Sequence, residues 1–280
     1  MHKTKLSDHL VLIAGALFLI LPVVVAFTTS THEAAEIHRS GLMLSPGGHF
    51  VDTYEKVLTK QGGFTGQVTG ARMLMNSLIL GIGFAIGKIV LSMLAAYAIV
   101  YFRFRFATLA FWVIFTTLLL PLEVRIMPSF EVMTRLGLLN TYSGLIVPLL
   151  ASATGTFYFR QFFKSVPDEL LEAARIDGAG PFKFFIDVLV PLSKTMIAAI
   201  FIIMFVYGWN QYLWPMLMTS DEHFFTLMRG IKQILQVWIG SQIPEYNEAF
   251  ALAVLAMLPP VLIVVVFQSW FIKGLTESDK

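Results

Sequence analysis

Long apolar runs separated by polar intervals dominate this chain. An α-helix needs about 20 apolar residues to cross the hydrocarbon of a bilayer, and runs near that length recur along the sequence. They predict six transmembrane helices, over residues 10–29, 74–102, 106–125, 141–160, 195–217 and 249–272. Pro259 and Pro260 predict a break in the last of them. The pattern therefore indicates an all-α polytopic membrane protein with a single transmembrane domain, residues 1–280.

The first apolar run has two interpretations, a cleaved signal peptide or a retained span. The small residue that a cleavage site requires two positions before Ala26 is replaced by Val24, so the run favours retention. A polar loop, Thr28–Met73, follows it. Within this loop, apolar residues at helical spacing predict one amphipathic helix, marked by Phe50, Tyr54, Val57 and Leu58.

Composition agrees with a lipid environment. Hydrophobic residues make up 56% of the chain and charged residues only 14%, far outside the soluble range. The net charge of +2 is too small to indicate a nucleic-acid partner, and the chain has no cysteine for disulfides or thiolate metal sites. His32 and His38 lack metal-ligand spacing, so we expect solvated loop histidines and no metal site.

The longest charged interval between two apolar runs, residues 161–192, predicts two short helices. Ser165 should cap the first helix, with Pro167 in its first turn. Gly178 stands where a left-handed residue ends a helix. Gly180-Pro181 should restart the chain into a second helix that ends before Pro191.

The first helix of this pair is amphipathic. Helical spacing places Leu170, Ala173 and Ala174 on one face, with Glu172 and Arg175 turned away. An interfacial helix that only holds two spans at a fixed angle would show the same pattern.

Basic residues at the span ends set the orientation. With the amino terminus inside, eleven Lys and Arg residues lie on the cytoplasmic side and eight on the outer side, four of them in one long loop. Both termini and the helix pair are therefore expected to be cytoplasmic.

The stretch Gly81–Lys88 resembles a phosphate-binding loop only superficially. The spacing before Gly87-Lys88 is wrong, and Ile89 replaces the hydroxyl that binds the metal. Gly83 and Gly87 instead form a GxxxG pair that lets two helices approach closely. No Walker motif occurs elsewhere, so we expect the chain not to hydrolyse ATP.

Lys88 lies near the middle of the second predicted span, where a lysine costs about 2.5 to 3.5 kcal/mol. Glu123 lies only at the outer end of the third predicted span, and no acidic residue lies deep in a span where it could pair with Lys88, which favours a pathway for an anion. The alternative is a lysine that snorkels or meets backbone carbonyls. The other candidates for the substrate pathway are polar residues in or near spans, namely Asn76, Arg125, Asn210 and Gln211. For the three amides the alternative is a hydrogen bond that cross-links helices. For Arg125 the alternative is an ion pair with Glu123.

At Glu172-Ala173-Ala174, followed by Gly178 and by Val190-Pro191, the sequence resembles the cytoplasmic EAA loop of ABC importer permeases. The family pattern usually reads Leu-Pro at the exit with a second proline four positions later, where this chain has Val190 and Thr195. Further similarity to permeases of bacterial sn-glycerol-3-phosphate importers covers most of the chain. It includes Leu119–Pro128, Glu172–Gly180, Pro191–Thr195, Tyr207–Pro215 and Lys273–Leu275.

The resemblance implies a type I ABC importer permease fold in the bacterial inner membrane. It implies that the chain forms half of the translocation pathway for sn-glycerol-3-phosphate or related glycerophosphodiesters and works by alternating access. It implies a homologous permease, an ATPase homodimer that holds ATP and Mg, and a periplasmic solute-binding protein as partners, with no cofactor on this chain. The residues implied to couple to the ATPase are Leu170, Glu172, Ala173, Ala174, Arg175, Asp177 and Gly178.

Other functions remain open on the sequence. The main alternative substrate is a sugar or polyol. An ion-coupled secondary carrier would need carboxylates or an inverted repeat within the membrane, and a membrane enzyme would need a catalytic cluster. Neither pattern is visible in the sequence.

Overall fold

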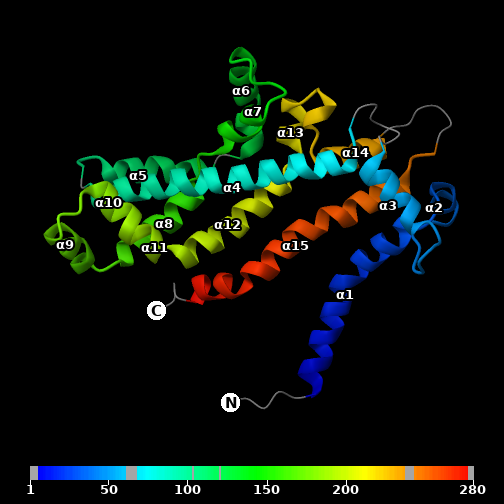
Figure 1. Ribbon diagram of the computed structural model, residues 1–280, viewed down its shortest axis with the longest axis horizontal. Coiled ribbons are helices and arrows are strands. Elements are labelled where there is room, and N and C mark those ends of the chain that lie inside the picture. The colour runs from blue at the N-terminus through cyan, green and yellow to red at the C-terminus, as the bar shows by residue number, and fades with distance from the viewer. Residues whose placement is uncertain (1–5, 61–67, 103, 120, 237–242, 277–280) are drawn as a thin grey trace. The chain divides into compact units, whose positions relative to one another are not determined.

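The computed structural model describes residues 6–60, 68–102, 104–119, 121–236 and 243–276, without the side chains of residues 118, 122–123 and 269–276. Within these ranges every regular element is a helix (Figure 1). The chain divides into two compact units, residues 1–76 with 221–259 and residues 77–220 with 260–280. Helices α4 and α15 each contribute residues to both units.

The first unit is held together by side chains of its short helices. Its elements are α1 (Leu6–Ser30), α2 (Ala34–Ser40), α3 (Phe50–Thr59), the start of α4 (Gly70–Tyr101), η4 (Glu222–Phe224), α14 (Leu227–Gln236) and the first part of α15 (Tyr246–Thr276). Lys56 of α3 forms an ion pair with the buried Glu248 of α15 at 2.5 Å. The hydroxyls of Ser30 and Tyr54 lie 3.1 Å apart and link α1 to α3. The amphipathic helix predicted around Tyr54 is thereby confirmed as α3.

His32 is not the solvated loop residue that the sequence predicted. Its side chain is buried, with Nε2 2.9 Å from the carbonyl oxygen of Ser45 and Nδ1 2.8 Å from a Glu36 carboxylate oxygen. The Ser45 carbonyl and then the Glu36 carboxylate raise the pKa of His32 above its usual value, because both acceptors favour a doubly protonated ring. The prediction was wrong because Ser45 is brought to the ring by a loop that no helical spacing reveals.

The second unit contains the remaining helices. They are the rest of α4, α5 (Ala107–Thr116), η1 (Thr117–Leu119), α6 (Leu122–Arg135), α7 (Tyr142–Ile146), η2 (Val147–Leu149), α8 (Ala153–Ser165), α9 (Asp168–Ile176), α10 (Pro181–Phe184), η3 (Phe185–Leu189), α11 (Val190–Leu192), α12 (Lys194–Trp209), α13 (Leu213–Met218) and the end of α15. Helix α8 packs against α5 and α12, and α13 packs against α6 and α7. In Figure 1, α9 and α10 lie at the carboxyl-terminal end of α4.

The core of this unit joins α4 to the chain around α7 and α13. It contains Leu80, Phe84, Ile126, Met133, Leu145, Leu149, Trp214 and Met218. The fully buried Trp214 donates its indole N–H to the carbonyl oxygen of Leu145 at 3.1 Å, so the one polar group of this large side chain is satisfied.

Three helices of the described chain are long and apolar enough to cross a membrane, namely α1, α4 and Tyr246–Gln268 of α15. The sequence predicted a break at Pro259-Pro260, but α15 continues through both prolines. Each proline removes only one N–H donor, and apolar surroundings strongly favour the backbone hydrogen bonds that remain.

Three predicted spans are interrupted in the structure. The interval 106–125 ends as a helix at Thr116, turns through η1 and restarts after Pro121 as α6. The interval 141–160 is split into α7, η2 and α8, with residues 150–152 non-helical. The interval 195–217 is divided between α12 and α13. Pro121 and Pro148 lack an N–H donor, and Ser152 offers a side-chain cap, so the sequence held signals for two of these breaks.

The GxxxG pair of α4 is a close-packing site, as predicted, but its neighbours are side chains and not the backbone of a second helix. A Cβ added to Gly83 would lie 2.7 Å from Cδ1 of Ile146, and one added to Gly87 would overlap the side chain of Leu150. Both glycines therefore leave room on α4 for side chains at the end of α7 and just after η2.

Replacing Gly87 by leucine should destabilise the protein, because the added atoms would occupy the space of Leu150. Overpacking of this kind costs roughly 1–3 kcal/mol, so the thermal unfolding midpoint of the purified protein in detergent should fall. Gly15→Leu in α1, where an added Cβ meets nothing within 4 Å, is the matched control. Equal midpoints for the two variants would contradict the close packing.

Candidate functional site

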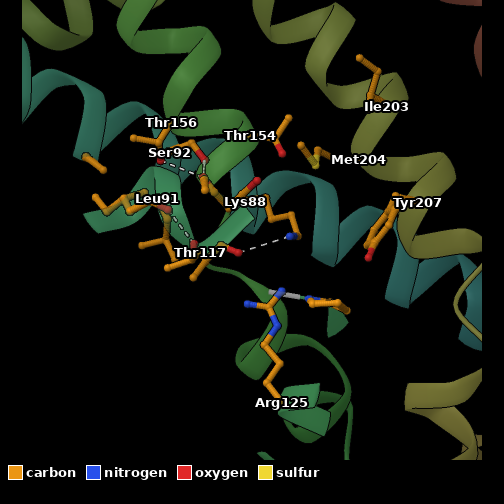
Figure 2. Close-up of a pocket in the computed structure, with 16 residues that line it drawn as sticks. Lys88, Leu91, Ser92, Thr117, Arg125, Thr154, Thr156, Ile203, Met204 and Tyr207 are labelled. Atoms are coloured by element: carbon orange, nitrogen blue, oxygen red, sulfur yellow. Dashed lines mark hydrogen bonds between the residues drawn. The ribbon is translucent and has the colours of Figure 1, made fainter. Parts of the chain in front are cut away.

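An open cavity of about 710 Å³ lies within the second unit. It is bounded by α4, by the turn from η1 into α6, by the start of α8 and by α12 (Figure 2). Its polar lining residues are Lys88, Ser92, Thr117, Arg125, Ser152, Thr154, Thr156 and Tyr207. The cavity therefore combines two basic side chains with several hydroxyl groups.

Lys88 enters this cavity from α4 and is only 9% exposed. Its Nζ donates a hydrogen bond to the carbonyl oxygen of Ala151 at 3.4 Å and lies 4.4 Å from the centre of the Phe84 ring. An ammonium group has three N–H donors, and this is the one hydrogen bond it makes within the described part of the chain. Lys88 therefore makes a contact with a backbone carbonyl, which was the alternative to a role in an anion pathway, and it also faces the cavity (Figure 2).

The carbonyl that Lys88 meets is available because the chain is not helical at residues 150–152. Ser152 ends this segment and caps α8, where its hydroxyl accepts from the N–H of Gly155 at 3.1 Å. On α4, one turn after Lys88, Ser92 donates to the carbonyl oxygen of Ser152 at 3.3 Å. The break in the predicted fourth span therefore forms one wall of the cavity.

Arg125 reaches the same cavity from α6 (Figure 2). Its side chain is exposed and pairs with no carboxylate whose position the structure describes. Glu123, the ion-pair partner that the sequence offered, has a side chain outside the described part. Among the described lining residues none is acidic, so the cavity carries positive charge and can attract an anion.

Tyr207 closes the cavity from α12, with its ring centre 5.9 Å from Nζ of Lys88. Neither Tyr207 nor the other cavity hydroxyls were identified from the sequence as lining residues. Isolated Ser and Thr residues in apolar runs carry no distinctive spacing, so only the fold brings Ser92, Thr117 and Thr154 together.

The other pathway candidates have different surroundings. Asn76 is fully buried in the first unit, where its amide donates to the carbonyl oxygens of His223 at 2.7 Å and Phe225 at 2.9 Å. Asn210 is exposed at the end of α12. Gln211 is buried and donates to the carbonyl of Tyr207 at 3.4 Å. None of these amides is among the residues that line the cavity.

The second candidate site is the helix pair, α9 together with the α10–η3–α11 segment. Gly178 has φ +72°, as the sequence predicted. Its N–H donates to the carbonyl of Arg175 at 3.0 Å, and that of Ala179 to the carbonyl of Ala174 at 2.8 Å. These bonds form the Schellman motif, which ends α9 and turns the chain sharply.

The faces of α9 differ in part from the prediction. Ala174 is buried, whereas Leu170 and Ala173, predicted to share its face, are exposed. The inward side is formed by Ala174 and Leu171, three residues apart, because a helix turns 100° per residue. The outward side also carries Ile176, which is 87% exposed.

The polar coupling candidates Glu172, Arg175 and Asp177 are exposed as well. Among them, Arg175 also lines a smaller pocket between α9 and α4.

Two local predictions for this pair were wrong. Ser165 does not cap α9; it ends α8 and donates to the carbonyl of Phe162 at 2.7 Å, because Pro167 displaces the helix start beyond its reach. The second helix does not end before Pro191 but continues to Leu192. A π-helical turn, Phe185–Leu189, precedes Pro191 and changes the hydrogen-bond register where the proline lacks its N–H.

Two tyrosines of α4 connect the helix pair to the rest of the unit. Tyr97 donates its hydroxyl to the carbonyl of Pro181 at 2.8 Å. The Tyr101 ring lies 5.4 Å from that of Phe184 in an edge-on contact. Sequence reasoning missed both tyrosines, although their spacing of four residues at the end of an apolar helix was visible.

Known proteins that are similar to this chain are components of transport systems. Residues 88–277 match the family model described as binding-protein-dependent transport system inner membrane component. A Brucella melitensis protein named sn-glycerol-3-phosphate transport system permease protein UgpE is 46% identical over 280 residues, 99% of this chain and 98% of its own length. A protein of the same name from Pectobacterium atrosepticum is 47% identical over 98% of this chain and 96% of its own.

Among solved structures, one described as a bacterial ABC transporter involved in the import of the acidic polysaccharide alginate is similar. The TM-score is 0.79 at 21% identity, covering 97% of this chain and 100% of the other. At this identity the likeness establishes the fold alone, which is that of an ABC importer permease.

Asn76 should matter for stability. In Asn76→Asp both amide donors are lost, and a buried carboxylate would face two carbonyl oxygens. The cost of leaving buried groups unsatisfied is roughly 1–3 kcal/mol, and more with the added charge, so the thermal midpoint should fall. Asn210→Asp at an exposed position is the control. A midpoint for Asn76→Asp as high as that of the control would contradict the structural role.

Proposed function

Because this chain belongs to the family of binding-protein-dependent transport system inner membrane components, we propose that it is a permease subunit of an ATP-driven importer of sn-glycerol-3-phosphate. The observation that supports this substrate is the similarity, over nearly the full length of both chains, to relatives named for sn-glycerol-3-phosphate transport. The cationic cavity supports an anionic substrate independently. The chain would form half of the translocation pathway, and a homologous permease the other half.

Six membrane crossings fit the helices of the proposed permease. Helices α1, α4 and α15 are long enough to cross alone. The remaining crossings would combine α5 with η1, α7 with α8, and α12 with α13. Interrupted crossings are tolerated where the freed backbone groups find partners, as the carbonyls of Ala151 and Ser152 do.

In the proposed topology both termini and the helix pair lie in the cytoplasm. The distribution of basic residues supports this orientation. Residues 1–5 and 277–280, which carry the two termini, lie outside the described part of the chain.

The helix pair would couple this chain to an ATPase homodimer. Leu170 and Ala173, both exposed, would pack against the ATPase, and the exposed Glu172, Arg175 and Asp177 would make polar contacts with it. On the opposite side of α9, Ala174 is buried and faces α4.

The proposed mechanism is alternating access. ATP and Mg would be held and ATP hydrolysed by the partner ATPase, and closure of its dimer would move the helix pair as a rigid body. That movement would shift the spans toward an outward-facing state, which accepts substrate from a periplasmic binding protein. This chain would contribute no hydrolytic chemistry of its own.

Gly178 tests the coupling role. In Gly178→Val a β-branched residue must adopt φ +72°, which costs at least about 1–2 kcal/mol, so the turn after α9 should be lost. We expect co-purification of the ATPase and ATP-driven uptake to fall about tenfold or more. Gly178→Asn should retain both, because asparagine tolerates this backbone conformation.

Gly180→Val is the matched control, since Gly180 is extended at φ −70° and ψ 168° and an added Cβ there meets nothing within 4 Å. Normal uptake by Gly178→Val, with the ATPase bound, would show that the turn does not transmit the movement.

A further inference from the structure

The charge of the cavity is concentrated at two side chains from different helices. Lys88 comes from α4 and Arg125 from α6, and Figure 2 shows both directed into the same space. Two like charges facing one cavity destabilise each other unless an anion lies between them. An arrangement of this kind is costly for stability alone, which indicates that a ligand uses it.

Lys88 is fixed in place without being neutralised. The Ala151 carbonyl and the Phe84 ring position its ammonium group, but both are uncharged. Its remaining N–H donors can therefore serve an anion. The burial of Lys88 strengthens such a contact, because a charge–charge interaction is screened less away from bulk water.

Hydroxyl groups line the cavity around these charges. Thr117, Thr154 and Tyr207 come from η1, α8 and α12. The hydroxyl of Thr117 donates to the carbonyl oxygen of Ile114 at 2.6 Å, so it offers a ligand an acceptor, while the other hydroxyls can both donate and accept. Together these groups match the hydroxyls of a polyol. The cavity therefore offers cationic contacts for a phosphate and neutral polar contacts for a glycerol moiety.

We propose that Lys88 and Arg125 together form the subsite that receives the phosphate group of the transported substrate. This inference rests on the proposed function. A phosphate monoester carries about −1.5 to −2 charges at pH 7, close to the two positive charges of the subsite. The guanidinium group binds phosphate oxygens in pairs, while the ammonium group acts as a compact charge at the other side.

The test uses the complete transporter in proteoliposomes: this chain, its partner permease, the ATPase and the binding protein loaded with sn-glycerol-3-phosphate. Two quantities are measured, uptake of labelled substrate and ATP hydrolysis stimulated by the loaded binding protein. Lys88→Gln removes the charge but keeps an N–H donor for the Ala151 carbonyl. Arg125→Gln removes the second charge, and Arg135→Gln, exposed on the same helix α6, is the matched control.

Uptake by Lys88→Gln and by Arg125→Gln should each fall about tenfold, the typical effect of losing one hydrogen bond to a charged group. Lys88→Arg should recover most of the uptake, since it restores the charge. Stimulated ATP hydrolysis should remain near that of the unmodified protein in all variants, as should uptake by Arg135→Gln.

Three results would overturn the subsite. One is uptake by both charge-removing variants equal to that of Arg135→Gln. Another is parallel loss of stimulated ATP hydrolysis, which would place the two residues in coupling. The third is an uptake deficit of the charge-removing variants that changes when anionic phosphatidylglycerol is added to zwitterionic phosphatidylcholine vesicles, which would identify an anionic lipid headgroup as the occupant.

Failure of the proposed function is distinguishable from these results. In that case the unmodified assembled transporter would import no sn-glycerol-3-phosphate although ATP and loaded binding protein are present, and the phosphate subsite would be rejected with it.

Discussion

The arrangement of the second unit depends on the close approach of α4 to the interrupted segment from the end of α7 to the start of α8. Gly83 and Gly87 leave room on α4 for Ile146 and Leu150, and Gly155 does the same on α8, where an added Cβ would lie 2.5 Å from Oγ of Ser92. With larger residues at these positions the backbones would stand apart. The carbonyls of the non-helical segment would then be out of reach of their donors on α4.

That approach also explains how a lysine can lie within an apolar helix. The interruption at residues 150–152 frees backbone carbonyls, and Lys88 and Ser92 on α4 satisfy those of Ala151 and Ser152. The interruption and the polar side chains are therefore mutually dependent. Neither would be stable in hydrocarbon without the other, and together they border the cavity.

Helix α4 joins this cavity to the helix pair. Lys88 and Tyr97 are nine residues apart on one continuous helix, about 14 Å along its axis at 1.5 Å per residue. Tyr97 holds the carbonyl of Pro181 at the start of α10. A movement of the pair can thus reach the cavity through a single rigid element, which is the physical content of the proposed coupling.

Much of the fold followed from local patterns in the sequence. The long helices α1, α4 and α15, the GxxxG contact and the left-handed Gly178 all rest on signals within a few turns of helix. Lys88 and Arg125 were recognised by their charge. What the sequence could not show depends on tertiary contacts: the burial of His32 by Ser45, the inward side of α9 and the cavity hydroxyls. The π-helical turn before Pro191 offsets a missing donor and has no periodic signature.

The most direct test of this account is a structure of the assembled transporter with sn-glycerol-3-phosphate trapped in the membrane domain. The account predicts phosphate density within hydrogen-bond distance of Nζ of Lys88 and of the guanidinium group of Arg125. Substrate bound with its phosphate on the partner permease alone, with Lys88 contacting only the carbonyl of Ala151, would contradict it.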